Sequence, residues 1–314
     1  MKELKVASAW PVVAFIPIDP SATMNSPDPA FQSVSRLTSL YHLPTAEQLT
    51  RMAGEYAGAK PFPHIVLDNF LSPKISSGNV QFPEFSWPGW KQFRDGYQFG
   101  KRVCNDIEVF PEVLRALLRE ACEPRFLQFL EKLTGIDGLL PDPYLSGGGL
   151  HSSGPGGILA AHTDFHIYSE LSLYRRLNLI IYFNDDWTES DGGALELTEK
   201  GEAAPMVAVL PLFGRAVIFN TDDISVHGFS KPIAEGKRRN SLALYYYTAK
   251  EVGVYSGDRT THWQEHGSRS GLHSVRVLAY KSLLLASRAL SRLAHMANPN
   301  VTSNAREGVT TNKG

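Results

Sequence analysis

The second half of the chain alternates short apolar runs with polar or glycine-containing turns. Runs of this length that end at turn residues predict β-strands, and eight of them can be assigned. They lie near residues 143–150, 156–163, 176–184, 193–198, 205–210, 215–220, 226–231 and 239–248. Many short strands in succession predict a β region that closes as a sandwich or a barrel.

The first half shows the periodicity of helices instead. Apolar residues recur at helical spacing from Pro111 to Thr134, and Pro124 divides this stretch into two helices. Thr45 and Gln48 have the spacing of a capping box, which predicts a helix that ends near Gly58. Helices first and strands afterwards predict an α+β chain, with a mainly β core braced by N-terminal helices.

Length and composition predict one large domain with extensions. The chain has 314 residues, of which 43% are hydrophobic, enough to bury a sizeable core. We expect an N-terminal arm and helix over residues 1–60, the β domain over 61–250 and a C-terminal helical extension over 251–314. In this extension an amphipathic helix from Val275 to Met296 is a candidate for packing on the β domain or for a homodimer contact. The tail from Asn298 has a composition that predicts disorder.

Charge and cysteine content restrict the class of protein. A formal net charge of -1 provides no general attraction to nucleic acid or membrane surfaces. Cys104 and Cys122 have no metal-ligand spacing and are interpreted as two reduced thiols. The N-terminal apolar run is interrupted by Pro11 and Pro17, and no apolar stretch approaches the roughly 18 to 20 residues that span a bilayer. We therefore expect a cytoplasmic protein without a nucleic-acid or membrane partner.

Residues 82–99 contain seven aromatic side chains, a density well above the 11% of the whole chain. One interpretation is a lid that walls a substrate pocket. The other is a loop whose rings pack on the core. The pattern favours the second interpretation without excluding the first.

Three residues of the β region have the types and spacing of a metal site. His162 and Asp164 are two positions apart, so in an extended segment both side chains point the same way. His227 follows the predicted strand 215–220 and a short polar turn, and it is the candidate third ligand. Two neutral imidazoles and one carboxylate can bind one face of an octahedral Fe(II) ion, which leaves three positions for a chelating co-substrate and O₂.

A second feature lies in the last predicted strand. Arg239 and Ser241 share one face of strand 239–248, whereas Arg238 would face the opposite way. A buried arginine near a metal needs an anion. Its planar guanidinium matches a carboxylate with two hydrogen bonds, and a serine hydroxyl adds a donor. A metal and a remote carboxylate-binding residue are what a keto-diacid such as 2-oxoglutarate requires.

Taken in order, these residues resemble the HxD…H…RxS pattern of the Fe(II)/2-oxoglutarate dioxygenases, especially their prolyl 4-hydroxylase-like branch. The similarity extends from Pro63 to about residue 249 and includes Gly147 to His151 and Gly192 to Leu197. The resemblance implies a double-stranded β-helix, a relative of the jelly-roll and cupin folds. One departure is Arg239, because prolyl 4-hydroxylases proper usually carry a lysine there; it bears on the prolyl substrate and leaves the chemistry unchanged.

The resemblance also implies a reaction. Such an enzyme consumes O₂ and 2-oxoglutarate at Fe(II), releases succinate and CO₂, and hydroxylates an unactivated C–H bond, with ascorbate as an optional reductant. The expected substrate is amino-acid-derived, either a prolyl or other peptidyl residue or a small amino acid or natural product. Asp164 favours hydroxylation, because related halogenases carry a small residue in place of this carboxylate.

Other site residues are less well defined. The family implies that Tyr144 donates its hydroxyl to the co-substrate, and Tyr182 competes for this role. Asn178, on the third predicted strand, is a candidate contact for the co-substrate or the product. His166 shares the direction of the two proposed ligands before it, so it is expected at the mouth of the site or as a structural residue.

Two further classes of protein stay open on the sequence alone. A zinc-dependent hydrolase can use two histidines and one aspartate, but it has no need of Arg239 and Ser241. A non-catalytic jelly-roll binding module would keep the strands without bringing metal-binding residues together.

Overall fold

The computed structural model describes residues 39–93, 97–202, 204–249 and 261–263, and seven single positions between 279 and 293. It divides the chain into two compact units, Met1–Trp263 and Gln264–Gly314. All seven single positions of the second unit are helical, in agreement with the helix predicted over 275–296. The predicted N-terminal arm and C-terminal tail lie outside the described residues, and the homodimer contact stays a prediction.

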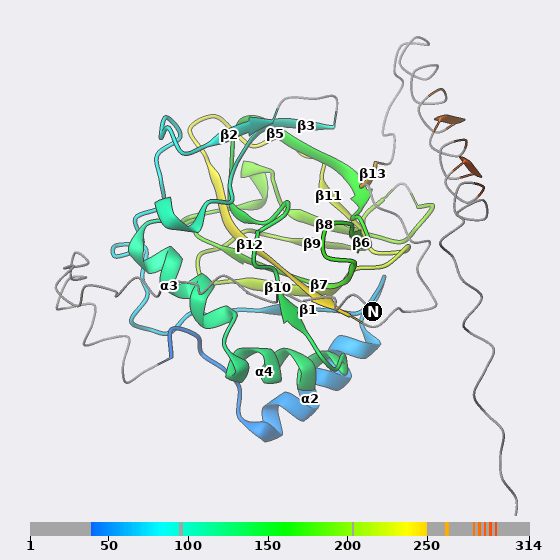
Figure 1. The fold of residues 1–314 in the computed structure, drawn as a ribbon. Helices are drawn as coiled ribbons and strands as arrows, with labels where there is room; N and C mark the ends of the chain where they lie inside the picture. Colours follow the sequence, from blue (N-terminus) through cyan, green and yellow to red (C-terminus); the bar gives the residue numbers. More distant parts are fainter. Residues whose placement is uncertain are drawn as a thin grey trace, which may run out of the picture. The chain divides into compact units, whose positions relative to one another are not determined.

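The first unit is built on antiparallel strands that curl into the barrel-like sheet of a jelly roll (Figure 1). The main series of neighbours is β1-β10-β7-β12-β5-β11-β8-β9. Strands β3, β4, β6 and β13 pair with members of this series, and β2 pairs with β3. The strands are β1 His64–Leu67, β2 Lys91–Phe93, β3 Gln98–Cys104, β4 Leu140–Pro141, β5 Gly149–Thr163, β6 Ile167–Tyr168, β7 Leu173–Tyr182, β8 Leu195–Thr198, β9 Val207–Val209, β10 Ala216–Asn220, β11 Val226–Phe229, β12 Arg239–Thr248 and β13 His262–Trp263. The predicted double-stranded β-helix is therefore confirmed.

Strand β5 joins two strands that the sequence predicts to be separate. Its first part pairs with β12 from Gly149 to Ser153, and its last part pairs with β11 at Leu159 and His162. The glycines between these parts predict bends or close backbone approaches, and the ladder with β3 is interrupted there, because Ser153 pairs with Lys101 and Ile158 pairs with Phe99. Gly156 has a φ of +71°, and a Cβ atom at Gly157 would lie 2.7 Å from the carbonyl oxygen of Gly154, so this prediction is confirmed. One long strand thus carries the chain from one half of the sheet to the other.

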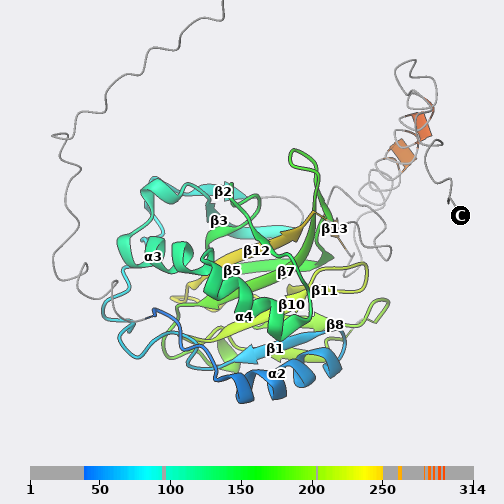
Figure 2. The same ribbon diagram turned by 60° about the horizontal axis from the view of Figure 1, so that its bottom comes forward.

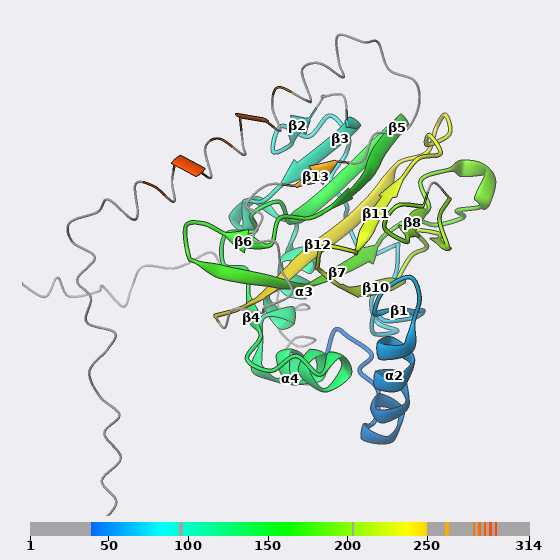
Figure 3. The ribbon, with the colours of Figure 1, turned by 90° about the vertical axis from the view of Figure 1, so that its right-hand side faces the viewer.

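Three helices are described in this unit, α2 Ala46–Gly58, α3 Glu112–Ala121 and α4 Pro124–Thr134. The capping box at the start of α2 is present, with Thr45 accepting from the backbone of Gln48 and the Gln48 side chain accepting from Thr45 N. Pro124 occupies the first turn of α4, where a missing N–H costs nothing. Figures 2 and 3 show α2 and α4 on the side of β1, β10 and β7. No helix among the described residues is long and apolar enough to cross a membrane.

Alternation along β7 and β12 separates the core from a cavity. Every second residue faces the helices in one large apolar cluster, which includes Leu177, Leu179, Ile181, Leu242, Leu244 and Tyr246. The residues between them line the cavity on the opposite face, namely Asn178, Ile180, Ser241, Ala243 and Tyr245. Because the helices cover only one face, the other face of the same strands is left to form a site.

The aromatic stretch of residues 82–99 packs on the core over its first half. The rings of Phe82 and Trp90 are stacked with centroids 6.2 Å apart, and Phe82 lies 5.7 Å from the ring of Phe183. Trp87 meets Trp90 edge to face at 5.4 Å. The packed-loop interpretation therefore accounts for residues 82–90, and the chain continues into β2 and β3.

Candidate metal centre

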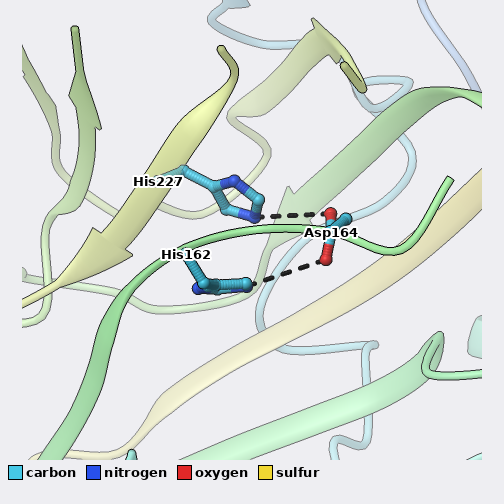
Figure 4. A group of neighbouring side chains, drawn as sticks. All are labelled: His162, Asp164 and His227. Atoms are coloured by element: carbon cyan, nitrogen blue, oxygen red, sulfur yellow. Dashed lines mark ion pairs between the residues drawn. The ribbon is translucent and has the colours of Figure 1, made fainter. Parts of the chain in front are cut away.

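Strands β5 and β11 bring the two predicted histidine ligands together. His162 and His227 are direct cross-strand partners, and their ring centroids lie 4.4 Å apart. Asp164 follows one residue after the end of β5 and turns its carboxylate toward both rings (Figure 4). One ligand atom from each of the three residues can be chosen so that all lie within 4.8 Å of one another. This spacing is suitable for a single metal ion.

Backbone hydrogen bonds orient both imidazole rings. His162 Nδ1 lies 2.9 Å from the carbonyl oxygen of Ala160, and His227 Nδ1 lies 3.0 Å from that of Ser225. The Nε2 atoms therefore face Asp164, at 3.7 Å from Oδ1 for His162 and 3.5 Å from Oδ2 for His227. Metal-binding histidines typically use their second nitrogen in this way, because it fixes the tautomer and the direction of the free nitrogen.

Burial sets the protonation states that a metal needs. It lowers the pKa of His162 to about 3, with the neighbouring His227 adding to the effect, and it also lowers the pKa of His227. Burial alone would raise the pKa of Asp164, but Arg175, the two histidines and Asn178 together lower it below its usual value. At neutral pH the site therefore presents two neutral imidazoles and a carboxylate, the forms that bind metal.

A hydrogen-bond network holds the carboxylate of Asp164. Arg175 Nη2 donates to Oδ2 at 2.8 Å, and Asn178 Nδ2 donates to the same oxygen at 2.7 Å. Arg175 in turn donates from Nε and Nη2 to Asn178 Oδ1 and lies over the ring of Tyr245 at 3.4 Å. Asn178 was predicted as a contact for the co-substrate or product; it lines the cavity, but its amide is committed to Asp164. Sequence reasoning missed Arg175, although a charged residue within an apolar strand was a signal.

Arg239 and Ser241 lie on the wall of the same cavity, which has a volume of about 340 Å³. Arg239 is 6% exposed. Its guanidinium donates from Nε to Gly193 O at 2.7 Å and from Nη2 to the Tyr182 hydroxyl at 3.1 Å. No described carboxylate forms an ion pair with it. A buried guanidinium without a counter-ion is suited to bind an anionic ligand.

The neighbours of Arg239 confirm the predicted alternation. Arg238 points to the other side, where its Nη1 lies 2.8 Å from Glu84 Oε2. Lys237 pairs with Asp191 at 3.4 Å. Of the three consecutive cations, only Arg239 lines the cavity.

Two predicted site residues lie elsewhere. Tyr144 precedes β5, is 59% exposed and borders a surface depression with Tyr168 and Glu170. Its rival Tyr182 is the tyrosine that contacts Arg239, so the geometry favours Tyr182, and the role of Tyr144 stays a prediction. His166 is fully buried, and its Nδ1 lies 3.3 Å from Asp223 Oδ1. The strand ends before His166, so the alternation that placed it at the mouth of the site does not continue.

Several other residues of the cavity lining, among them His151, were not predicted from the sequence. His151 lies next to Ser241 in the sheet, and its Nε2 is 3.1 Å from Gly147 O. Burial lowers its pKa well below the usual value, so the imidazole is neutral. Lys91, Lys101 and Asn105 come from the β2–β3 hairpin and the residues after it.

Comparisons with known proteins agree with this geometry. Residues 148–247 match the family model of the 2OG-Fe(II) oxygenase superfamily. Prolyl 3-hydroxylase OGFOD1 of Xenopus laevis is 26% identical over 191 residues, which are 60% of this chain and 35% of that protein. The match thus spans about a third of the length of this relative.

Among solved structures, a prolyl-4-hydroxylase of Pseudomonas putida is 16% identical, and the alignment covers 64% of this chain and 99% of that one with a TM-score of 0.45. A prolyl hydroxylase of Trichoplax adhaerens, in complex with a hypoxia inducible factor peptide fragment, is 15% identical over 64% of this chain and 91% of that one, with a TM-score of 0.43.

The paired histidines and the aspartate thus lie within the region that matches the 2OG-Fe(II) oxygenase superfamily. Residues 148–247 therefore have both the sequence pattern of that superfamily and a cluster of side chains that could hold a metal ion.

Proposed function

We propose that this enzyme hydroxylates an unactivated C–H bond of an amino-acid-derived substrate, with 2-oxoglutarate and O₂ as co-substrates and succinate and CO₂ as products. One observation carries the proposal. A buried His-Asp-His cluster and a buried guanidinium without a described counter-ion line one cavity. The first binds a divalent metal, and the second accounts for the far carboxylate of a keto-diacid.

The donor set fits Fe(II). Two imidazole nitrogens and one carboxylate oxygen are converging, buried and in their metal-binding protonation states. When bound, Fe(II) and 2-oxoglutarate supply the oxidising chemistry. His162, Asp164 and His227 would hold the metal on one side.

The remaining residues position and shield the reaction. Arg239 would pair with the far carboxylate of 2-oxoglutarate, and the Ser241 hydroxyl, on the same face of β12, would donate a further hydrogen bond. Arg175 and Asn178 occupy Asp164 Oδ2 and so fix the direction of the carboxylate. The apolar wall made by Leu195, Ile180 and Phe229 limits the access of water.

The amino-acid-derived substrate is supported by the similarity to a curated protein named as a prolyl 3-hydroxylase. A prolyl or other peptidyl residue and a small amino acid or natural product both remain within this class. The zinc-hydrolase alternative leaves Arg239 without a role. The halogenase alternative conflicts with Asp164, which occupies the position that a halide would need.

The proposal is tested by anaerobic titration of the protein with Fe(II) and 2-oxoglutarate. We expect a weak charge-transfer absorbance that requires both components, followed by substrate-dependent succinate release when O₂ is admitted. A parallel sample loaded with Zn(II) is the control. Turnover with Zn(II) and without 2-oxoglutarate would instead identify a hydrolase.

A further inference from the structure

The β2–β3 hairpin places two lysines on the wall of the metal cavity. Lys91 is exposed and Lys101 is half-buried, and both line the cavity that contains the His-Asp-His cluster. Lys101 is paired across the sheet with Ser153 of β5, the strand that carries His162. Lys91 therefore lies on the solvent side of the cavity lining, and Lys101 lies deeper.

The pairing of β3 with β5 changes register just before Lys101, whose side chain lines the cavity. The extra residues lie in β5, between Ser153 and Ile158. The pairing register with β5 shifts between Phe99 and Lys101, and Gly100 between them has a φ of +67°. After the shift, Lys101 and Val103 face the cavity, whereas Arg102 faces away and lies 3.4 Å above the ring of Phe85. Glycine adopts this backbone conformation without strain, so Gly100 permits the change of register that precedes Lys101.

The charge of Lys101 acts within the cavity. After burial, it is the largest cause that lowers the pKa of His151, which lines the same cavity. Its Nζ donates to Gln98 Oε1 at 3.1 Å. Lys91 Nζ donates to a neutral partner, Asn105 Oδ1, at 2.7 Å. Both ammonium groups belong to residues of the cavity lining.

The described lining of the cavity is dominated by cations. Lys91, Lys101, Arg175 and Arg239 contribute positive charge, and Asp164 is the single carboxylate that the described lining contains. Asp164 is matched by Arg175. In formal charge, a ferrous ion and a 2-oxoglutarate dianion balance each other. Among the described lining residues, cations therefore still outnumber carboxylates when the co-substrate is bound, and a lining of this kind attracts anions and repels cations.

We propose that Lys101, with Lys91 on its solvent side, forms a subsite for a carboxylate group of the substrate. This inference rests on the proposed function and narrows its substrate class to acids. The carboxylate could belong to a free acid or to an acidic residue next to the reacting residue of a peptide. The ammonium groups would hold it by charge-assisted hydrogen bonds.

The test uses the full chain, loaded anaerobically with Fe(II) and 2-oxoglutarate, so that Arg239 is already occupied. N-acetyl-L-proline and its neutral analogue N-acetyl-L-prolinamide probe a free acid. The amidated dipeptides N-acetyl-prolyl-glutamate and N-acetyl-prolyl-glutamine probe an acidic side chain. Binding is measured as a shift of the charge-transfer absorbance and by calorimetry. Neither readout depends on turnover.

We expect the protein to bind at least one carboxylate probe more tightly than its amide partner. Lys101→Gln should weaken binding of that carboxylate about 10-fold, the loss of one charge-assisted contact, and leave the amide unchanged. Lys101→Arg should retain most of the affinity. Lys200→Gln, which removes an exposed lysine in a turn, is the matched control and should behave like the unaltered protein.

Two outcomes would overturn the subsite. One is a protein that takes up Fe(II) and 2-oxoglutarate normally but prefers neither carboxylate to its amide. The other is a Lys101→Gln variant that binds the acid and the amide with equal losses, since this would indicate a structural defect. Failure of the unaltered protein to take up 2-oxoglutarate would count against the proposed function itself, and the absorbance before any probe is added distinguishes this case.

Discussion

Two arginines are buried in the wall of one cavity, and their surroundings differ. Arg175 is 1% exposed and donates to the carboxylate of Asp164. Arg239 is 6% exposed and donates only to a carbonyl and a tyrosine hydroxyl among the described residues. Burial lowers the pKa of both, but Asp164 and the nearby tyrosines reverse this effect at Arg175 and raise its pKa, whereas at Arg239 the pKa stays lowered.

This difference indicates that the charge of Arg175 stabilises the folded protein, whereas the charge of Arg239 serves to bind a ligand. Burying an ion is costly, and a carboxylate partner offsets that cost in the folded protein itself. Arg175 has such a partner, so its charge helps to hold the cavity wall. Arg239 lacks a described carboxylate partner, so it gains most when an anion arrives from solution. Mutations at the two sites should therefore affect different quantities.

The largest effect is expected for Asp164→Ala, which removes a metal ligand and leaves Arg175 unmatched. Succinate formation should fall to background, and the affinity for Fe(II) should fall by more than the roughly 10- to 100-fold typical of outer contacts. The free energy of unfolding should drop by about 3–5 kcal/mol, because a buried charge loses its partner. Metal titration and chemical denaturation measure these changes. Asp185→Ala, at an exposed position, is the control, and full activity in Asp164→Ala would refute the metal site.

Arg175→Met should come next. It leaves Asp164 buried with only Asn178 as a donor to Oδ2. We expect the free energy of unfolding to fall by about 3–5 kcal/mol and the affinity for Fe(II) to fall roughly 10- to 100-fold, because the carboxylate loses its orientation. The affinity for 2-oxoglutarate, measured at saturating metal, should change much less. A stable variant with normal metal binding would show that the ion pair has no structural role.

Arg239→Met should give the opposite pattern. The affinity for 2-oxoglutarate should fall roughly 10- to 100-fold, since a two-fold hydrogen-bonded carboxylate contact is lost, while Fe(II) binding stays normal. The free energy of unfolding should stay within about 1 kcal/mol or rise, because an unmatched buried charge has been removed. Loss of stability similar to that of Arg175→Met would remove the distinction between the two arginines.

Local signals predicted those parts of the molecule that depend on neighbours in sequence. The capping box at Thr45 and the break at Pro124 set helix boundaries, as expected. The two-residue spacing of His162 and Asp164 and the alternation around Arg239 placed four side chains on one cavity, because strand alternation is imposed by the backbone.

Long-range pairing decided what the sequence could not reveal. The glycines of β5 indicate bends, but they do not show that β3 pairs on both sides of them and joins the two predicted strands into one. Arg175 looks like a surface charge until the chain brings Asp164 to it. Lys101 rather than Arg102 lines the cavity after a register shift beside Gly100, and neither this shift nor the φ of Gly100 is evident from the residue types. Each case depends on a partner distant in sequence or on a shift of register.

The smallest effect is expected for the tyrosine beside the co-substrate, where Tyr144 and Tyr182 are the two candidates. Tyr182→Phe removes the hydroxyl that accepts from Arg239 Nη2, so the guanidinium should be less well oriented. We expect the affinity for 2-oxoglutarate to fall a few-fold, in line with one hydrogen bond of about 1 kcal/mol. Tyr144→Phe, at a residue 59% exposed and outside the cavity lining, should leave it unchanged. The reverse result would mean that Tyr144 moves to the co-substrate on binding, and the role of Tyr182 beside Arg239 would then be structural.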